Sequence, residues 1–195
     1  MDALTVYCAS SDTIDDAYRS AAMQVGETLA ERGITLVFGG GRVGLMGEVA
    51  RSVRGNGGRV VGVITRTLMD LEQGDPDCDE LIVVDTMRER KRLLVERGDG
   101  FVVLPGGIGT YEEFFETLVG RQLGEHDKPI GIVNTRDFYR PLLDLFEHGE
   151  AEHFIRPGAR NLFFVHDDPA AVIDSLERPP SVVMPRLTPD DPWLK

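Results

Sequence analysis

An apolar segment runs directly into a glycine turn in residues 101–113, Phe-Val-Val-Leu-Pro-Gly-Gly-Ile-Gly-Thr-Tyr-Glu-Glu. The apolar run predicts a buried strand over Phe101–Leu104, and the turn opens a helix that we expect to start near Thr110. The first N–H groups of such a helix have no intrahelical partner and lie at the positive end of its dipole. Three glycines of the turn lack the Cβ atom that would keep a ligand off the backbone: Gly106, Gly107 and Gly109. The stretch is therefore typical of an anion-binding site.

Glu113 lies one turn into this predicted helix, close to any group attached to a bound phosphate. Thr110 and Glu113 also have the spacing of a capping box, in which the glutamate only satisfies a backbone N–H group. A second stretch of the same build, Thr-Leu-Val-Phe-Gly-Gly-Gly-Arg-Val-Gly-Leu-Met-Gly at residues 35–47, favours ligand binding over simple capping. It adds Gly40 and Gly41 to the candidate binding residues.

Apolar strand segments alternate with helical segments along the chain. Strands are expected at residues 4–9, 35–38, 59–64, 81–84, 101–104, 130–133 and 162–165, most of them continuous apolar runs that suit a sheet covered on both faces. Helices are expected at residues 15–32, 45–54, 87–96, 111–123, 139–153 and 169–176. This alternation predicts an α/β fold with a doubly wound parallel sheet, whose ligands lie at the carboxyl ends of the strands. Residues 65–80 are expected to form a long surface loop.

Length and composition indicate a single soluble domain. The 195 residues are 42% apolar and 28% charged, so we expect one domain over residues 1–178 and a proline-rich tail over residues 179–195. The net charge of −12 argues against binding to nucleic acid or to an anionic membrane. No apolar run approaches the ~18 residues of a membrane span and no signal peptide is recognisable, so a cytoplasmic location is expected. Neither Cys8 and Cys78 nor the histidines have the spacing of a metal site, and no metal is expected.

A basic cluster interrupts this acidic chain at residues 87–92, Met-Arg-Glu-Arg-Lys-Arg. Helical spacing puts four residues on one face: Met87, Arg90, Lys91 and Leu94. An arginine on an inward face needs an anionic partner, because burying an unpaired guanidinium is costly. A ligand phosphate or Glu113 would provide one. The alternative is a solvated helix face with a capping box between Thr86 and Glu89.

Other motifs leave alternatives open. Gly39-x-Gly41-x-x-Gly44 matches the dinucleotide fingerprint, but the next strand ends in Ile64-Thr65-Arg66 without the acidic residue that would bind a ribose. Because an arginine there suits a 2′-phosphate, an NADP oxidoreductase remains an alternative. Ser10, at the end of the first strand, is either a ligand-binding hydroxyl or an ordinary helix cap.

Residues 105–113, Pro-Gly-Gly-Ile-Gly-Thr-Tyr-Glu-Glu, resemble the P-G-G-x-G-T-x-x-E signature of the Lonely Guy (LOG) family. These proteins are cytokinin riboside 5′-monophosphate phosphoribohydrolases, sometimes mislabelled lysine decarboxylases. The resemblance extends from about Val6 to Leu176 and includes residues 39–47, Met87-x-x-Arg90-Lys91 and residues 122–129. It implies a Rossmann-like homodimer that hydrolyses the N-glycosidic bond of a purine nucleoside 5′-monophosphate, of the cytokinin type or AMP, without a cofactor.

The resemblance also implies roles for individual residues. Arg90 and Glu113 would be the catalytic pair, and the nucleotide would contact Glu72, Lys91, Gly107, Ile108, Gly109 and Thr110. The residue patterns described above add Ser10, Gly40, Gly41, Met87 and Gly106 to the substrate-binding set.

Two features of the sequence depart from the family pattern. Arg88 replaces the usual histidine, and Val119-Gly120-Arg121 replaces the commoner Thr-Trp-Ala, which leaves the identity of the base open.

A non-catalytic carrier of a nucleotide or of the molybdenum cofactor is a further alternative. For the homodimer, we expect helices 87–96 and 111–123 to supply apolar contacts, including Leu94, Phe114, Phe115 and Leu118.

A carboxylate suits the implied reaction. Breaking the glycosidic bond builds positive charge on the sugar, which the carboxylate of Glu113 would stabilise while it orients or deprotonates water. Arg90 would hold either the 5′-phosphate or Glu113, and the sequence leaves both roles open.

Overall fold

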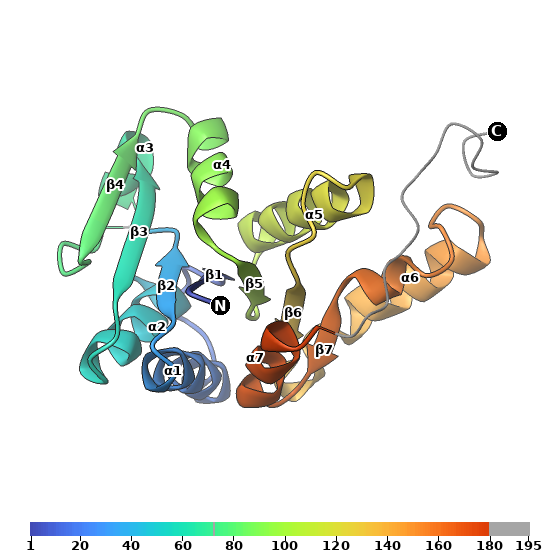
Figure 1. Cartoon of the computed structure of the whole chain (residues 1–195), viewed down its shortest axis with the longest axis horizontal. Helices are drawn as coiled ribbons and strands as arrows, with labels where there is room; N and C mark the ends of the chain where they lie inside the picture. The colour runs from blue at the N-terminus through green and yellow to red at the C-terminus, as the bar shows by residue number, and fades with distance from the viewer. Residues whose placement is uncertain (72, 180–195) are drawn as a thin grey trace.

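Seven parallel strands form one sheet in the order β4-β3-β2-β1-β5-β6-β7 (Figure 1). The computed structural model describes residues 1–71 and 73–179. All strand pairs are parallel, which confirms the predicted doubly wound α/β fold. The strands are β1 (Ala3–Tyr7), β2 (Thr35–Phe38), β3 (Val60–Thr65), β4 (Glu80–Val84), β5 (Gly100–Val103), β6 (Ile130–Val133) and β7 (Phe164–His166).

Helices cover both faces of the sheet, giving three layers. One face carries α1 (Asp16–Glu31), α2 (Gly44–Gly55) and α7 (Pro169–Glu177). The other face carries α4 (Met87–Arg97), α5 (Ile108–Leu123) and α6 (Arg140–Ala151). Three shorter elements complete the described chain: α3 (Arg66–Leu71) and the 3₁₀ helices η1 (Thr135–Asp137) and η2 (Ala159–Leu162). Within residues 1–71 and 73–179, no helix has the length and apolar character needed to span a membrane.

The central strand β1 contacts both helical layers because successive side chains point to opposite faces. Leu4 and Val6 pack in the core beneath α1, α2 and α7. Thr5 faces α4, where its hydroxyl donates a hydrogen bond to the Leu94 carbonyl at 2.7 Å. Tyr7 faces α5 and shares a 3.1 Å hydrogen bond with the hydroxyl of Thr117.

The strand order reverses between β1 and β5. Strand β1 pairs with β2 on one side and with β5 on the other, so the loops that leave β1 and β5 diverge toward opposite faces of the sheet. In doubly wound sheets this switch point opens a crevice at the carboxyl ends of the strands. Both glycine turns follow strands next to this point, one after β2 and the other after β5.

The predicted strands and major helices are all present, with three local differences. The expected loop over residues 65–80 is wrong: it contains α3 and a bridge between Gly41 and Gly74 that ties it to the turn after β2. The last strand starts at Phe164 because η2 takes up the residues before it. Helix α5 starts at Ile108, ahead of the expected position. Residues 180–195 lie outside the described residues, so the tail at 179–195 and the boundary of the 1–178 domain stay predictions.

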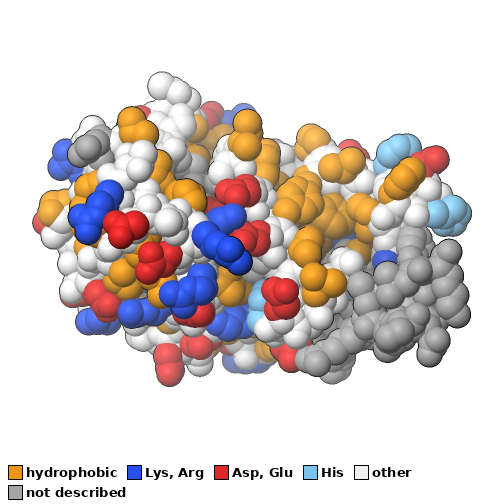
Figure 2. Space-filling view, turned by 90° about the horizontal axis from the view of Figure 1, so that it is seen from above, with side chains coloured by type: hydrophobic (Ala, Val, Ile, Leu, Met, Phe, Trp, Pro, Cys, Tyr) orange, Lys and Arg blue, Asp and Glu red, His pale blue; other side chains and the backbone are white. Residues whose placement is uncertain are grey.

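Most apolar residues expected at a homodimer contact are instead part of the core. Leu94, Phe114 and Leu118 are at most 4% exposed, because they pack between α4, α5 and the sheet. Only Phe115 of that set is partly open, at 37%. The exposed apolar side chains of α5 are Ile108, Phe115, Val119 and Leu123. Figure 2, viewed from this side, shows hydrophobic side chains gathered beside a group of charged ones.

Candidate active site

The N-terminus of α5 opens onto the crevice. Its N-cap is Gly107, no side chain caps the helix, and the first intrahelical bond runs from Tyr111 N–H to the Gly107 carbonyl at 3.0 Å. The amides of Ile108, Gly109 and Thr110 therefore have no acceptor within the helix. Since Thr110 lies inside the helix, the capping-box interpretation of Thr110 and Glu113 is wrong.

The side chain of Thr110 packs against the turn that precedes the helix. A Cβ atom added to Gly106 would lie 2.1 Å from the Thr110 hydroxyl oxygen. A glycine at position 106 therefore lets the backbone close tightly on α5.

Arg90 is buried beneath this crevice, with 5% of its surface exposed. It lies in the first turn of α4, whose N-cap Thr86 accepts a hydrogen bond from Glu89 N–H at 3.2 Å. The guanidinium donates through Nε to the Val63 carbonyl at 3.0 Å and through Nη2 to the Gly39 carbonyl at 3.1 Å. It is thus bonded to the strand β3 and to the end of β2.

Glu113 is the anionic partner that Arg90 requires. Arg90 Nη1 lies 3.6 Å from Glu113 Oε1, and the two side chains are 6% and 13% exposed. The prediction of an anionic partner for Arg90 is therefore confirmed. The negative charge of Glu113 also acts on Tyr7, whose pKa is raised first by burial and then by this carboxylate. Tyr7 consequently stays protonated and uncharged beside the pair.

A cavity of about 240 Å³ joins these groups. The pair and the start of α5 form one wall, and the segment after β1 forms the other. The lining residues are Cys8, Ala9, Ser10, Ser11, Met46, Arg90, Gly107, Ile108, Gly109, Thr110 and Glu113. The structure thus brings together both predicted catalytic residues, Ser10 and four residues of the glycine turn. The sequence offered no signal for Cys8 and Met46 beyond their places next to β1 and in α2.

A second, apolar cavity of about 230 Å³ adjoins the first. The two share Ala9, Ser11 and Gly107. The rest of its lining comes from α1, α2, the segments that precede α1 and α6, and the β5–α5 turn: Ile14, Tyr18, Leu45, Pro105, Gly106 and Phe138. Gly106 therefore lines the apolar cavity and is absent from the lining of the cavity that holds Arg90 and Glu113.

Lys91 does not reach the cavity. Its ammonium binds Glu112 at 2.7 Å and Glu116 at 2.8 Å, and these carboxylates raise its pKa. Consecutive helical residues project about 100° apart, so burying Arg90 turns Lys91 toward a separate groove between α4 and α5. Met87, 41% exposed, is also absent from the cavity lining.

Gly40 and Gly41 have structural contacts instead of lining the cavity. The Gly40 carbonyl accepts a 2.8 Å hydrogen bond from Asp75 N–H, and Gly41 bridges Gly74. Gly40 also has a φ of +77°, a conformation that favours glycine. Glu72 lies outside the described residues.

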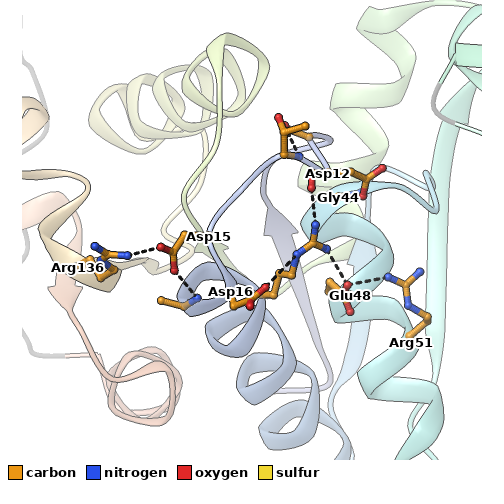
Figure 3. A network of polar contacts seen from close by, with 11 residues as sticks. Asp12, Asp15, Asp16, Gly44, Glu48, Arg51 and Arg136 are labelled. Carbon is orange, nitrogen blue, oxygen red and sulfur yellow. Dashed lines mark hydrogen bonds and ion pairs between the residues drawn. The ribbon is translucent and has the colours of Figure 1, made fainter.

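The turn after β2 is closed to ligands by the chain itself. Gly44 N–H donates to the Asp12 carboxylate at 2.9 Å, as Figure 3 shows, and Leu45 N–H donates to the Ala9 carbonyl at 2.9 Å. Of the two glycine turns, the one after β5 therefore has the expected helix N-terminus without a side-chain cap among the described residues. In the same region, Arg66, considered as a 2′-phosphate ligand, pairs with Asp85 at 2.8 Å.

Comparisons with known proteins agree with the sequence resemblance. A family model described as "Possible lysine decarboxylase" matches residues 46–176. The chain is 42% identical over 172 residues to a probable cytokinin riboside 5′-monophosphate phosphoribohydrolase, LOGL2 of Oryza sativa subsp. japonica, covering 88% of this chain and 70% of that protein. It is 41% identical over 177 residues to the cytokinin riboside 5′-monophosphate phosphoribohydrolase of Rhodococcoides fascians, covering 90% and 89%.

Solved structures share the fold at lower identity. The molybdenum cofactor binding protein of Rippkaea orientalis superimposes with a TM-score of 0.69 at 19% identity, covering 91% of this chain and 96% of that one. The molybdenum cofactor carrier protein of Chlamydomonas reinhardtii gives the same values. This likeness concerns the fold alone.

Replacing Gly39 by alanine tests how tightly the site is packed around Arg90. A Cβ atom at position 39 would lie 2.3 Å from Arg90 Nη2, so Gly39→Ala must displace the guanidinium. We expect the free energy of unfolding to fall by about 1–3 kcal/mol in urea titrations. Gly55→Ala is the control, because nothing lies within 4 Å of its added Cβ. Equal stabilities for the two variants would contradict this account.

Proposed function

Since this chain belongs to the family of cytokinin riboside 5′-monophosphate phosphoribohydrolases, we propose that it hydrolyses purine nucleoside 5′-monophosphates to free base and ribose 5-phosphate. The buried pair of Arg90 and Glu113, facing the open amides at the start of α5, is the observation that carries the proposal. A cavity with one anion-binding end and one fixed carboxylate suits a substrate with a single phosphate next to the bond that breaks.

The amides of Ile108, Gly109 and Thr110 would bind the 5′-phosphate. They have no acceptor in their own helix and lie at the positive end of its dipole, and they line the same cavity as Glu113. Binding the phosphate there would position the ribose beside the carboxylate, which lowers the entropic part of the barrier.

Arg90 would serve mainly to position Glu113. Two of its three nitrogens already donate to the carbonyls of Val63 and Gly39, and the third faces the carboxylate. These contacts favour the second of the two roles left open by the sequence, in which the guanidinium holds the Glu113 side chain in place.

Glu113 would act on both the sugar and the water. As the bond between C1′ and the base nitrogen breaks, its electron pair goes to the base, and Glu113 stabilises the positive charge left on the ribose. Water then bonds to C1′ and gives up a proton to Glu113; the departing base takes up one proton from solvent, and Glu113 releases its proton to solvent, which restores the carboxylate. The products are the free base and ribose 5-phosphate.

The alternative functions have less support. An NADP oxidoreductase needs the turn after β2 for its pyrophosphate, and that turn is occupied by Asp12 and Ala9. A lysine decarboxylase would be expected to hold a reactive lysine in its site, yet no lysine lines the described cavity and Lys91 faces another groove. The carrier alternative rests on a shared fold at 19% identity.

The requirement for a phosphate gives the first test. We expect kcat/KM for AMP to exceed that for adenosine by about 10²-fold or more, since two charge-assisted hydrogen bonds to the phosphate would supply that difference. Chromatography of the released adenine measures both rates. Equal rates on AMP and adenosine would refute the phosphate site at α5.

The charge of Glu113 gives the second test. Glu113→Gln keeps the shape of the side chain but removes its negative charge, so turnover of AMP should fall by about 10²-fold or more, with near wild-type binding. Glu112→Gln is the matched control, because this neighbouring carboxylate is 51% exposed and binds Lys91 outside the cavity. A Glu113→Gln protein with normal turnover would exclude Glu113 from the chemistry.

Homodimer formation through α5 is part of the proposal. Phe115, Val119 and Leu123 are spaced by four residues and form an exposed apolar stripe. Val119→Glu should therefore shift the mass in light scattering from two chains to a single chain of 21.5 kDa. Met23→Glu is the control: Met23 is similarly exposed, but it lies on α1, on the other face of the sheet. A wild-type protein with the mass of one chain would overturn the dimer.

A further inference from the structure

The loop between β1 and α1 supplies an internal anion to helix α2. Asp12 Oδ1 accepts a 2.9 Å hydrogen bond from Gly44 N–H, the first amide of α2 (Figure 3). The residue at the N-cap position is Val43, and its side chain makes no capping hydrogen bond. The carboxylate of Asp12, 32 positions away in the sequence, therefore satisfies the first free amide of α2, where a bound anion could otherwise accept the hydrogen bond.

The same loop forms one wall of the cavity. The Ala9 carbonyl accepts hydrogen bonds from Leu45 N–H at 2.9 Å and Met46 N–H at 3.4 Å, while Ala9 N–H donates to the Pro105 carbonyl at 3.2 Å. The wall is thus held between α2 on one side and the turn before α5 on the other. Ser10 and Ser11 follow directly and line the cavity.

Gly44 lets the loop approach α2 this closely. Its φ is +57°, and an added Cβ atom would lie 2.5 Å from the Ser10 carbonyl carbon and 2.7 Å from Ser11 N. The backbone of the wall therefore rests directly on the first residue of the helix.

A network of charges supports Asp12 from outside. Arg19 donates to the backbone carbonyl of Asp12 and binds Glu48 at 3.0 Å, and Glu48 also binds Arg51 at 3.1 Å. Figure 3 shows these contacts joining the loop, α1 and α2. Arg19 and Glu48 are 25% and 21% exposed, so the network is partly shielded from water.

We propose that Asp12 is a positioning residue, whose carboxylate on the N-terminus of α2 fixes the Ala9–Ser11 wall opposite the ligand-binding amides of α5. The inference rests on the proposed function for its effect on substrate. Arg90 and Glu113 belong to the opposite wall, so Asp12 contributes to ligand binding and does not affect the rate of the chemical step.

Three variants of the full-length chain test this role. Asp12→Ala removes the hydrogen bond to Gly44, and Asp12→Asn keeps an acceptor oxygen while removing the charge. Asp16→Ala is the matched control, because it removes a nearby carboxylate that is fully exposed and has only a 3.9 Å contact with Arg19. Amide hydrogen exchange of residues 9–12 reports on the wall itself, and steady-state kinetics with AMP reports on the ligand.

We expect Asp12→Ala to speed exchange in residues 9–12 and to raise KM for AMP about fivefold, from the loss of one hydrogen bond, with kcat within about twofold. Asp12→Asn should restore both properties, since the asparagine side chain keeps an acceptor oxygen for Gly44 N–H. Unchanged exchange and KM in Asp12→Ala, or an equal change in Asp16→Ala, would overturn the positioning role.

The exchange measurement and the kinetic measurement also separate this inference from the proposed function. If the wild-type protein releases no base from AMP or from isopentenyladenosine monophosphate, the proposed function fails, while the exchange measurement still decides whether Asp12 fixes the wall. If the wild type is active and only the exchange prediction fails, the role of Asp12 falls and the proposed function stands.

Discussion

The site depends on the burial of one guanidinium. Arg90 lies where three elements meet: it binds the carbonyls of Val63 and Gly39 at the sheet and faces Glu113 on α5. Removing a partner from such a group leaves a buried charge without compensation, which costs far more than the pair gains in isolation. Glu113 supplies that compensation. The contact between Arg90 and Glu113 therefore both stabilises the buried guanidinium and places the carboxylate in the cavity.

The two glycine turns are alike in sequence and different in use. Each follows a strand and opens a helix, but α2 receives the carboxylate of Asp12 and the carbonyl of Ala9, whereas the start of α5 has no side-chain cap. What distinguishes them is the neighbouring loop. The anion-binding potential of a helix N-terminus is therefore decided by what the rest of the fold places over it.

The sequence predicted the parts of this structure that follow from local pattern. Apolar runs, most of them continuous, located the strands of the described chain, and the unfavourable burial of a lone guanidinium identified the need of Arg90 for an anion. Prediction from the sequence failed where contacts between distant segments determine the position of a side chain. The direction of Lys91 follows from which residue of α4 is buried, and the contact of Asp12 with Gly44 joins segments that no spacing rule relates. The short helix α3 was missed because six residues give too little periodicity to detect.

The capping carboxylate of Asp12 is tethered to the helix it caps. A tethered group binds at an effective concentration set by its linker, of order millimolar for short flexible chains, and it loses no translational freedom on binding. A dissolved anion must compete against that local concentration to reach α2, whereas no side chain of residues 1–71 and 73–179 caps the start of α5. Within the described residues, a tethered carboxylate therefore holds the start of α2, and under the proposed function the phosphoryl group of the substrate would be directed to the start of α5.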